Sequence, residues 1–505
     1  MFIKVINWCN HSILARDNEP IFYLEKDNWD DNYFKTRYHL HLSGKYTDND
    51  KGLWIGEVKI LRKGQRKEDT ALLETGRLDF LGYRFCSVGQ SLDYYEKISR
   101  LDEPLRYKIL SALRDIIIYP EIKKDFENEE GMDASLFHFL NEEDNIFTLA
   151  PALISGDFKS LPPPNISFTF QCASLQEPVE FLFESPEYGY HESADETTRV
   201  SVLSLEGNSV SGEFLSRLAQ ITYASNEERD LLPDTGILVP TGTAFTKIVC
   251  ISYSVLPVFR IPGIYIQSKE QIAREISQGI GRFIYCGIHD LTKEMEEAVT
   301  HYAIDTDGRV WENENPSVEP PGTSVKSTEE LCAEFVKCMV LIEQNSDKQD
   351  ILENVFGFLH EQDDLKFIAE ITFPNLTEDE LHAFFLTLPP GHQLLFHLLA
   401  TCVLGISPRS LVLFHEPESG MPSAILPVLV KSLSHILERE NAFMIVSTQL
   451  PDLFSDGIYK QVSTLNQNND APSTASAEKE KADDKDNMVI SHILGLPNDI
   501  FPPSS

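Results

Sequence analysis

Short alternations of apolar and polar side chains fill the first part of the chain. They occur at residues 2–6, 21–24, 34–42 and 53–61 and are separated by turns rich in Asn, Asp and Gly. A period of two residues is typical of half-buried β-strands. From residue 91 to 143 the apolar residues follow a helical spacing instead. The pattern predicts an N-terminal region over residues 1–150 that is β-rich and completed by helices.

A second block begins after the run Leu161-Pro-Pro-Pro-Asn165, which breaks both periods. Four strand-like segments follow it, with the sequences ISFTF, VEFLF, RVSVLSL and KIVCISYSV. We expect residues 160–290 to form the first half of an α/β core. Residues 291–386 then have an almost wholly helical pattern. They are predicted to form a helical insertion that projects outward from the core.

Helices and wholly apolar strands alternate over residues 387–463. This alternation is typical of a parallel sheet that is buried on both faces, so this segment is expected to be the second half of the core. Residues 464–505 are polar and acidic and contain few aromatic side chains. Such a composition predicts a disordered segment with a short C-terminal tail.

The net charge narrows the range of partners. Asp and Glu number 79 and Lys and Arg 43, which gives a formal charge of −36. Non-specific DNA binding depends on Lys and Arg that release counterions from the phosphates, so the charge argues against direct DNA binding. On composition alone, the favoured interpretation of the charge is that it keeps the protein soluble.

Cysteine usage and hydropathy indicate the compartment. The eight cysteines form no CxxC pair and have no zinc-like spacing to histidines, so they are expected to be reduced core residues. No apolar run approaches the ~20 residues that a membrane span needs. We therefore expect a cytoplasmic protein. We also expect no bound metal.

Three motifs occur in one order near the C-terminal end of the chain: Leu388-Pro-Pro-Gly-His-Gln393, Ser410-Leu-Val-Leu-Phe-His-Glu-Pro-Glu418 and Met444-Ile-Val-Ser-Thr-Gln-Leu-Pro451. This order resembles the second half of ABC-type ATPases of the SMC and overcoming-lysogenisation class, where a signature helix precedes a Walker B strand and a switch loop. The N-terminal segment Leu24-Glu-Lys-Asp-Asn-Trp-Asp30 is similar to that of bacterial phage-defence AAA/ABC ATPases. The resemblance implies an ABC-type P-loop ATPase-like α/β core with a parallel sheet.

Such a core should contain a phosphate-binding P-loop after its first strand. The matching position is a degenerate P-loop, made of Gly207, Asn208, Ser209, Val210, Ser211, Gly212 and Glu213. Gly212 stands where the family has the phosphate-binding lysine, and Glu213 replaces the magnesium-binding hydroxyl. A carboxylate ~4 Å from an anionic ligand costs roughly 4 kcal/mol at an effective dielectric near 20, about a thousandfold in affinity. We therefore expect no ATP or magnesium as a cofactor.

The catalytic positions that the resemblance implies are also altered. His415 stands at the magnesium-binding aspartate, and imidazole is a poor magnesium ligand. Glu416 keeps the position of the catalytic base, whereas Gln449 replaces the switch histidine and Pro389 the signature serine. The degenerate signature consists of Gly391, His392 and Gln393.

These losses predict a pseudo-ATPase that serves as a scaffold or sensor subunit in a bacterial anti-phage defence complex. It would act by self-association or by binding a partner such as a nuclease or toxin subunit. One alternative is an active ABC-type ATPase with an atypical nucleotide pocket, coupled to a nuclease. A further alternative, based on charge alone, is an acidic decoy that mimics nucleic acid.

Plainer interpretations exist for each of these positions. Gly391 and His392 also fit an ordinary helix start after two prolines, which suit a first helical turn. His415 also fits a buried histidine at a strand end, and residues 206–213 an ordinary surface loop.

A separate group of N-terminal carboxylates contains Glu25, Asp27, Asp30 and Asp31. The group could serve metal or nuclease chemistry. Because no pattern of His or Lys accompanies it, we expect a solvated turn instead.

Overall fold

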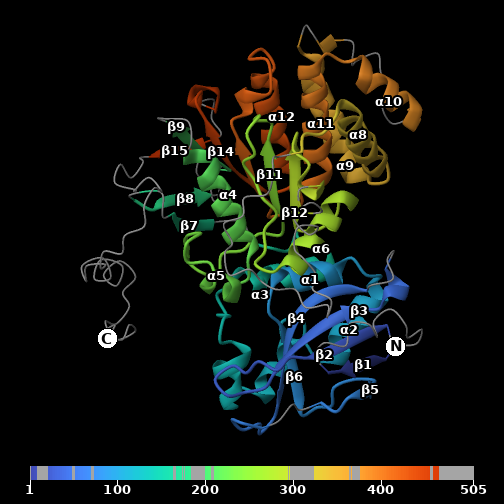
Figure 1. Cartoon of the computed structure of the whole chain (residues 1–505), viewed down its shortest axis with the longest axis vertical. Helices are drawn as coiled ribbons and strands as arrows, with labels where there is room; N and C mark the ends of the chain where they lie inside the picture. Colours follow the sequence, from blue (N-terminus) through green and yellow to red (C-terminus); the bar gives the residue numbers. More distant parts are fainter. Residues whose placement is uncertain are drawn as a thin grey trace, which may run out of the picture. The chain divides into compact units, whose positions relative to one another are not determined.

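The computed structural model describes residues 2–7, 21–47, 52–69, 73–162, 166–172, 175, 177–183, 199–205, 210–293, 295, 324–362, 365–366, 376–454 and 459–465. All of them belong to one compact unit, Met1–Gln467. They form a mixed α/β fold with three sheets (Figure 1). The predicted α/β class, with a β-rich N-terminal part and a parallel sheet, is confirmed. The tail predicted beyond residue 465 lies outside the described residues.

The N-terminal sheet has the order β5-β1-β2-β3-β4-β6, and all its pairs except β1 with β2 are antiparallel. Its strands are β1 (Ile3–Ile6), β2 (Phe22–Lys26), β3 (Arg37–Leu42), β4 (Leu53–Arg62), β5 (Gly76–Leu78) and β6 (Phe85–Gly89). Helices α1 (Leu92–Ser99), α2 (Glu103–Leu113) and α3 (Asn145–Ser155) share its hydrophobic core. The predicted alternation therefore buries one face of the strands under these helices.

A small antiparallel sheet follows, with the order β10-β7-β8. It consists of β7 (Ile166–Gln171), β8 (Val179–Phe183) and β10 (Ile237–Val239). The ISFTF and VEFLF segments thus form strands outside the parallel sheet. Phe168 and Phe170 of β7 pack in one cluster with Phe214 of helix α4 (Val210–Tyr223).

The largest core surrounds a six-stranded sheet with the order β12-β11-β13-β14-β9-β15, in which every pair is parallel. Its strands are β9 (Val200–Leu205), β11 (Ile248–Ser252), β12 (Phe283–Gly287), β13 (Leu411–His415), β14 (Phe443–Thr448) and β15 (Tyr459–Leu465). Strands from both predicted halves therefore join in one sheet, with β9 of the first half between β14 and β15 of the second. Helix α4 and helix α6 (Ile266–Gln278) pack on one face (Figure 1).

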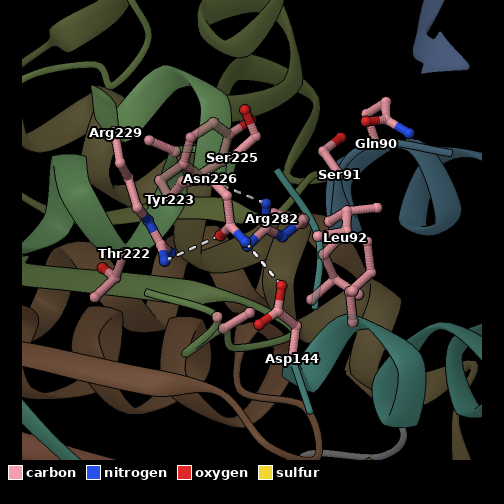
Figure 2. A pocket seen from close by; sticks show the side chains of 15 residues that line it. Gln90, Ser91, Leu92, Asp144, Thr222, Tyr223, Ser225, Asn226, Arg229 and Arg282 are labelled. Atoms are coloured by element: carbon pink, nitrogen blue, oxygen red, sulfur yellow. Dashed lines mark hydrogen bonds between the residues drawn. The ribbon is translucent and has the colours of Figure 1, made fainter. Parts of the chain in front are cut away.

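The N-terminal sheet contacts the α4 end of the core through polar groups. The Tyr223 hydroxyl lies 3.3 Å from an Asp93 oxygen, and the Arg37 guanidinium lies 2.7 Å from Glu227 of helix α5 (Asn226–Asp230). A cavity of about 30 Å³, large enough for about two ordered waters, lies beside this contact (Figure 2). Its polar lining is internally paired, because Asn226 donates to Asp144 at 2.8 Å. The cavity is far too small for a nucleotide.

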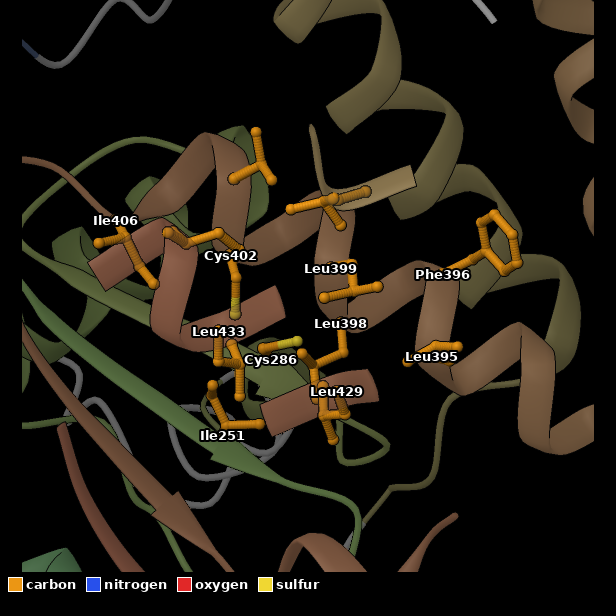
Figure 3. Close-up of a cluster of buried hydrophobic side chains, with 14 of the residues drawn as sticks. Ile251, Cys286, Leu395, Phe396, Leu398, Leu399, Cys402, Ile406, Leu429 and Leu433 are labelled. Carbon is orange, nitrogen blue, oxygen red and sulfur yellow. The ribbon is translucent and has the colours of Figure 1, made fainter. Parts of the chain in front are cut away.

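Among the described helices, α11 (Pro390–Gly405) and α12 (Leu426–Arg439) lie against the other face of the parallel sheet. Behind them, α8 (Thr328–Glu343), α9 (Ser346–His360) and α10 (Glu378–Thr387) pack in the same hydrophobic cluster. Side chains of α11 and α12 surround Ile251 and Cys286 of the sheet (Figure 3). Phe335 of α8 and Val355 of α9 belong to the same buried cluster. Helices α8 and α9 of the predicted helical insertion therefore share a hydrophobic core with α11 and α12.

Candidate functional site

Strands β9, β11, β13 and β14 all end at one edge of the parallel sheet, which we call the carboxyl edge. Ligands of open α/β sheets bind outside this edge. The chain passes from β9 into α4 here, as the resemblance implies. Gly207, Asn208 and Ser209 lie outside the described residues. Val210 starts α4.

The His415 ring lies beneath the first turn of α4. Its Nε2 atom is 3.4 Å from the Ser211 Oγ atom, and a Cβ atom added to Gly212 would lie 3.3 Å from the same nitrogen. Burial lowers the pKa of His415, an effect that the nearby Glu416 carboxylate partly opposes. Burial thus favours the neutral form of this imidazole, which fills the space where the resemblance implies a magnesium-binding aspartate.

Two buried polar atoms at this position have no hydrogen-bond partner among the described residues: Nδ1 of His415 and Oγ of Ser447. The two residues are register partners on β13 and β14. Buried polar groups are normally paired, so each of these atoms marks a place that water or a ligand group can satisfy.

Glu416 has a left-handed backbone, with φ of 42°, which costs energy in any residue other than glycine. Its N–H group donates to the Ser447 carbonyl at 2.8 Å, which fixes this conformation. The carboxylate accepts a hydrogen bond from the Ser419 hydroxyl at 2.8 Å and lies 4.0 Å from His415 Nε2. The predicted base is thus close to His415 and already hydrogen-bonded within the chain.

Glu418 was not among the predicted site residues. It accepts hydrogen bonds from the Thr448 hydroxyl at 2.9 Å and from the Gln449 backbone N–H at 2.6 Å. The loop after β14 is therefore attached to the loop after β13. Its place as the second carboxylate of the HEPE sequence is the signal that could have identified Glu418 as a site residue.

Glu213 differs from its predicted role. Its carboxylate pairs with Arg217 one turn along α4 at 2.6 Å, and its side chain is 47% exposed. The charge that we expected to face a ligand is therefore balanced by a neighbouring arginine at the helix surface.

Gly391, His392 and Gln393 form the first turn of α11. A Cβ atom on Gly391 would lie 2.7 Å from Pro422, and the Gln393 amide donates to the Phe385 carbonyl at 3.2 Å. Among the described residues, no hydrogen bond or ion pair joins these three to Ser211 or His415. Close packing on the loop after β13 explains the glycine without a nucleotide.

A buried polar chain inside the adjoining core was also missed. Tyr253, just after β11, has its hydroxyl 2.8 Å from Nδ1 of His397, and Nε2 of that ring lies 2.8 Å from Glu334. Burial acts to lower the pKa of His397, but the neighbouring Cys286 and Glu334 groups raise it to about 9. These neighbours favour the protonated form of the buried His397 ring behind the carboxyl edge.

Of the four N-terminal carboxylates, only Asp30 is exposed as expected for a solvated turn. Glu25 and Asp31 are buried, and lie 3.1 Å from His41 and from Lys59, respectively. Asp27 pairs with His39 at 3.0 Å. The antiparallel strands β3 and β4 supply these basic partners, which the local sequence did not reveal.

The described residues contain no group of three or more His, Cys, Asp or Glu side chains arranged to hold a metal ion. No helix among them is long and apolar enough to cross a membrane. The seven cysteines in the described part of the chain are free, and all but Cys338 are buried.

Comparison with known proteins gives one distant relative. The chain is similar to protein ea59 of Escherichia phage lambda. The two are 23% identical over 436 residues, which cover 85% of this chain and 77% of the phage protein. Because so much of the chain is matched, the likeness to ea59 includes parts of both the N-terminal sheet and the parallel sheet. No protein-family model matches the chain, and no solved structure matches it.

Proposed function

We propose that this protein is a pseudo-ATPase with an ABC-type core that acts as a scaffold or sensor subunit by binding other proteins. The observation that carries the proposal is the buried His415 ring beneath the first turn of α4. Mg-ATP bound in the usual P-loop manner would need an anionic metal ligand at the position of His415 and a lysine at the position of Gly212. The chain offers neither.

The setting that we propose is conflict between phage and bacterium, in the cytoplasm. The relative ea59 comes from a phage, which supports such a setting. Within it, the protein would hold a nuclease or toxin subunit of an anti-phage defence complex. The chain's strong negative charge favours a partner with a basic surface.

Calorimetry with Mg-ATP should detect no site tighter than about millimolar, because a missing charge pair alone removes roughly a thousandfold in affinity. The single change Gly212→Lys should not restore binding. Its side chain would start 3.3 Å from the His415 ring and 3.4 Å from Val258. The triple change Gly212→Lys, Glu213→Ser and His415→Asp restores all three residues that the resemblance implies, and is the variant to compare with the single change.

One observation favours the alternative of an active ATPase with an atypical pocket. Glu416 keeps the base position in a strained backbone, and such strain is concentrated at functional sites. A micromolar Mg-ATP site in the unaltered protein, with turnover lost in Glu416→Gln, would replace the proposal with this alternative.

Association should depend on the exposed loop after β11. Val255 is 80% exposed and Leu256 is 74% exposed, and this loop leaves the carboxyl edge. Burying them in a partner surface of at least about 1,000 Å² would account for their exposure. We expect Val255→Asp with Leu256→Asp to abolish self-association or partner binding, measured by light scattering of the full chain alone and with the products of neighbouring genes.

The matched control is Phe80→Asp with Tyr83→Asp, which alters a similarly exposed pair at the N-terminal sheet. The control should bind as the unaltered protein does. Binding to a basic partner should weaken as salt is raised, because a Debye length of about 8 Å screens exposed charges at physiological ionic strength. A strict monomer that binds none of these neighbours would remove the scaffold proposal.

A further inference from the structure

The opposite edge of the parallel sheet, which we call the amino edge, brings three polar residues together. Arg199 immediately precedes β9, Arg409 lies just before β13, and Asn441 lies just before β14. The Arg199 Nη2 atom donates to the Asn441 side-chain oxygen at 3.0 Å, and the Arg409 backbone N–H donates to the Asn441 carbonyl at 3.3 Å. Asn441 therefore links the two arginines.

The Arg199 guanidinium is buried without enough acceptors. The residue is 7% exposed, yet its Nε and Nη1 atoms have no hydrogen-bond partner in the part of the chain that the structure describes. No carboxylate among the described residues forms an ion pair with it. A buried, unpaired charge strongly disfavours the folded state, so a persisting one calls for a bound counter-charge.

Arg409 adds a second positive charge. One of its terminal nitrogens donates to the Pro162 carbonyl, which brings no negative charge. Burial lowers the pKa of Arg409, and the neighbouring Arg199 lowers it further. Burial also lowers the pKa of Arg199, an effect that Glu438 partly opposes. The two guanidinium groups are thus close enough to repel each other.

Backbone strain is concentrated at the same place. Arg409 has φ of 66° and Asn441 has φ of 47°, so two non-glycine residues adopt the left-handed region within one hydrogen-bonded group. Residues with a strained backbone cluster at ligand sites and switches, where contacts with the surrounding structure stabilise the conformation.

We propose that Arg199 and Arg409, positioned by Asn441, form a binding site for a small oxyanion, either a phosphate or a carboxylate. Guanidinium groups donate several hydrogen bonds to such oxygens, and the anion would supply both the missing acceptors and the missing negative charge. The site lies at the amino edge, at the other end of the strands from His415. It therefore does not depend on the proposed function.

The test measures the melting temperature of the full chain against inorganic phosphate, acetate and chloride at constant ionic strength. Phosphate or acetate should raise the melting temperature by about 1–3 °C per tenfold increase above its dissociation constant, whereas chloride sets the baseline. A shift with phosphate alone identifies a phosphate site, and a shift with acetate alone identifies a carboxylate site.

The variant Arg199→Met has a paired signature. In chloride this variant should melt at the same or a higher temperature than the unaltered protein. The substitution removes a buried unpaired charge, and methionine has a side-chain volume similar to that of arginine. It should also lose the anion-dependent shift. Arg409→Met should reduce the shift several-fold. The control Arg274→Met removes a charge from the exposed face of α6 and should keep the full shift.

Three results would overturn the site. The first is no anion-dependent shift in the unaltered protein. The second is a shift that persists in Arg199→Met. The third is a lower melting temperature of Arg199→Met in chloride, since that result means that the chain itself supplies the counter-charge.

Discussion

Replacing Lys59 by methionine is expected to lower the free energy of unfolding by about 3 kcal/mol, because it removes one of the two positive partners of the buried Asp31 carboxylate. Lys59 is fully buried in β4, with its Nζ atom 3.1 Å from an Asp31 oxygen and 3.1 Å from the Ser135 carbonyl. Among the described residues, Asp31 would keep Arg37, 3.1 Å away, as its counter-charge. Urea unfolding followed by fluorescence measures the loss.

Two variants define this effect. Lys67→Met removes an ion pair with Glu130 in which both side chains are about half exposed, and should change stability by less than about 1 kcal/mol. The double change Lys59→Met with Asp31→Asn should recover part of the loss, because both charges leave together. Equal losses in Lys59→Met and Lys67→Met would show that burial of the first pair has no energetic consequence.

The stability of the protein should fall between pH 6.5 and pH 9 as His397 loses its proton. Its folded-state pKa is raised to about 9 from the ordinary 6.5, so the folded state binds this proton more tightly than the unfolded state does. The contribution is complete below pH 6.5 and lost as the pH rises through about 9. Its size is about 2–3 kcal/mol, since Glu334 is 42% exposed and its charge is partly screened.

The comparison that isolates this contribution is the unfolding free energy of the unaltered protein minus that of His397→Gln, measured from pH 6 to pH 10. The difference should shrink as pH rises. Other groups titrate equally in both proteins and cancel. A difference that is independent of pH would mean that His397 is neutral in the folded protein.

Strand positions in the parallel sheet could be predicted because their sequences allow few alternatives. The strands around Val412 and Ile445 are apolar over residues 411–414 and 443–446 and are separated by helical spacing, which indicates parallel strands buried on both faces. The start of α8 is also determined by residues close together in the sequence, because Ser327 and Glu330 form a reciprocal capping box there.

The polar groups could not be predicted, because their partners are distant in sequence. Glu25 and Asp31 were expected to be solvated, yet the register of β3 and β4 places basic side chains beside them. His397 belongs to an apolar helix, and its partners come from α8, from β12 and from the loop after β11. A local pattern shows which side chains are buried but not which groups they meet.

The order of strands has a consequence for synthesis in the cell. Val200 of β9 pairs with Met444 of β14 and with Tyr459 of β15, so both neighbours of β9 are made long after it. A ribosome adds about 5–20 residues per second, so the roughly 240 residues that separate β9 from β14 take about 12–48 s. During that interval both edges of β9 expose unpaired backbone groups, which invite aggregation. The yield of this protein should therefore depend on chaperone supply. A premature stop before Phe443 should leave β9 without β14, the strand that joins it to β13.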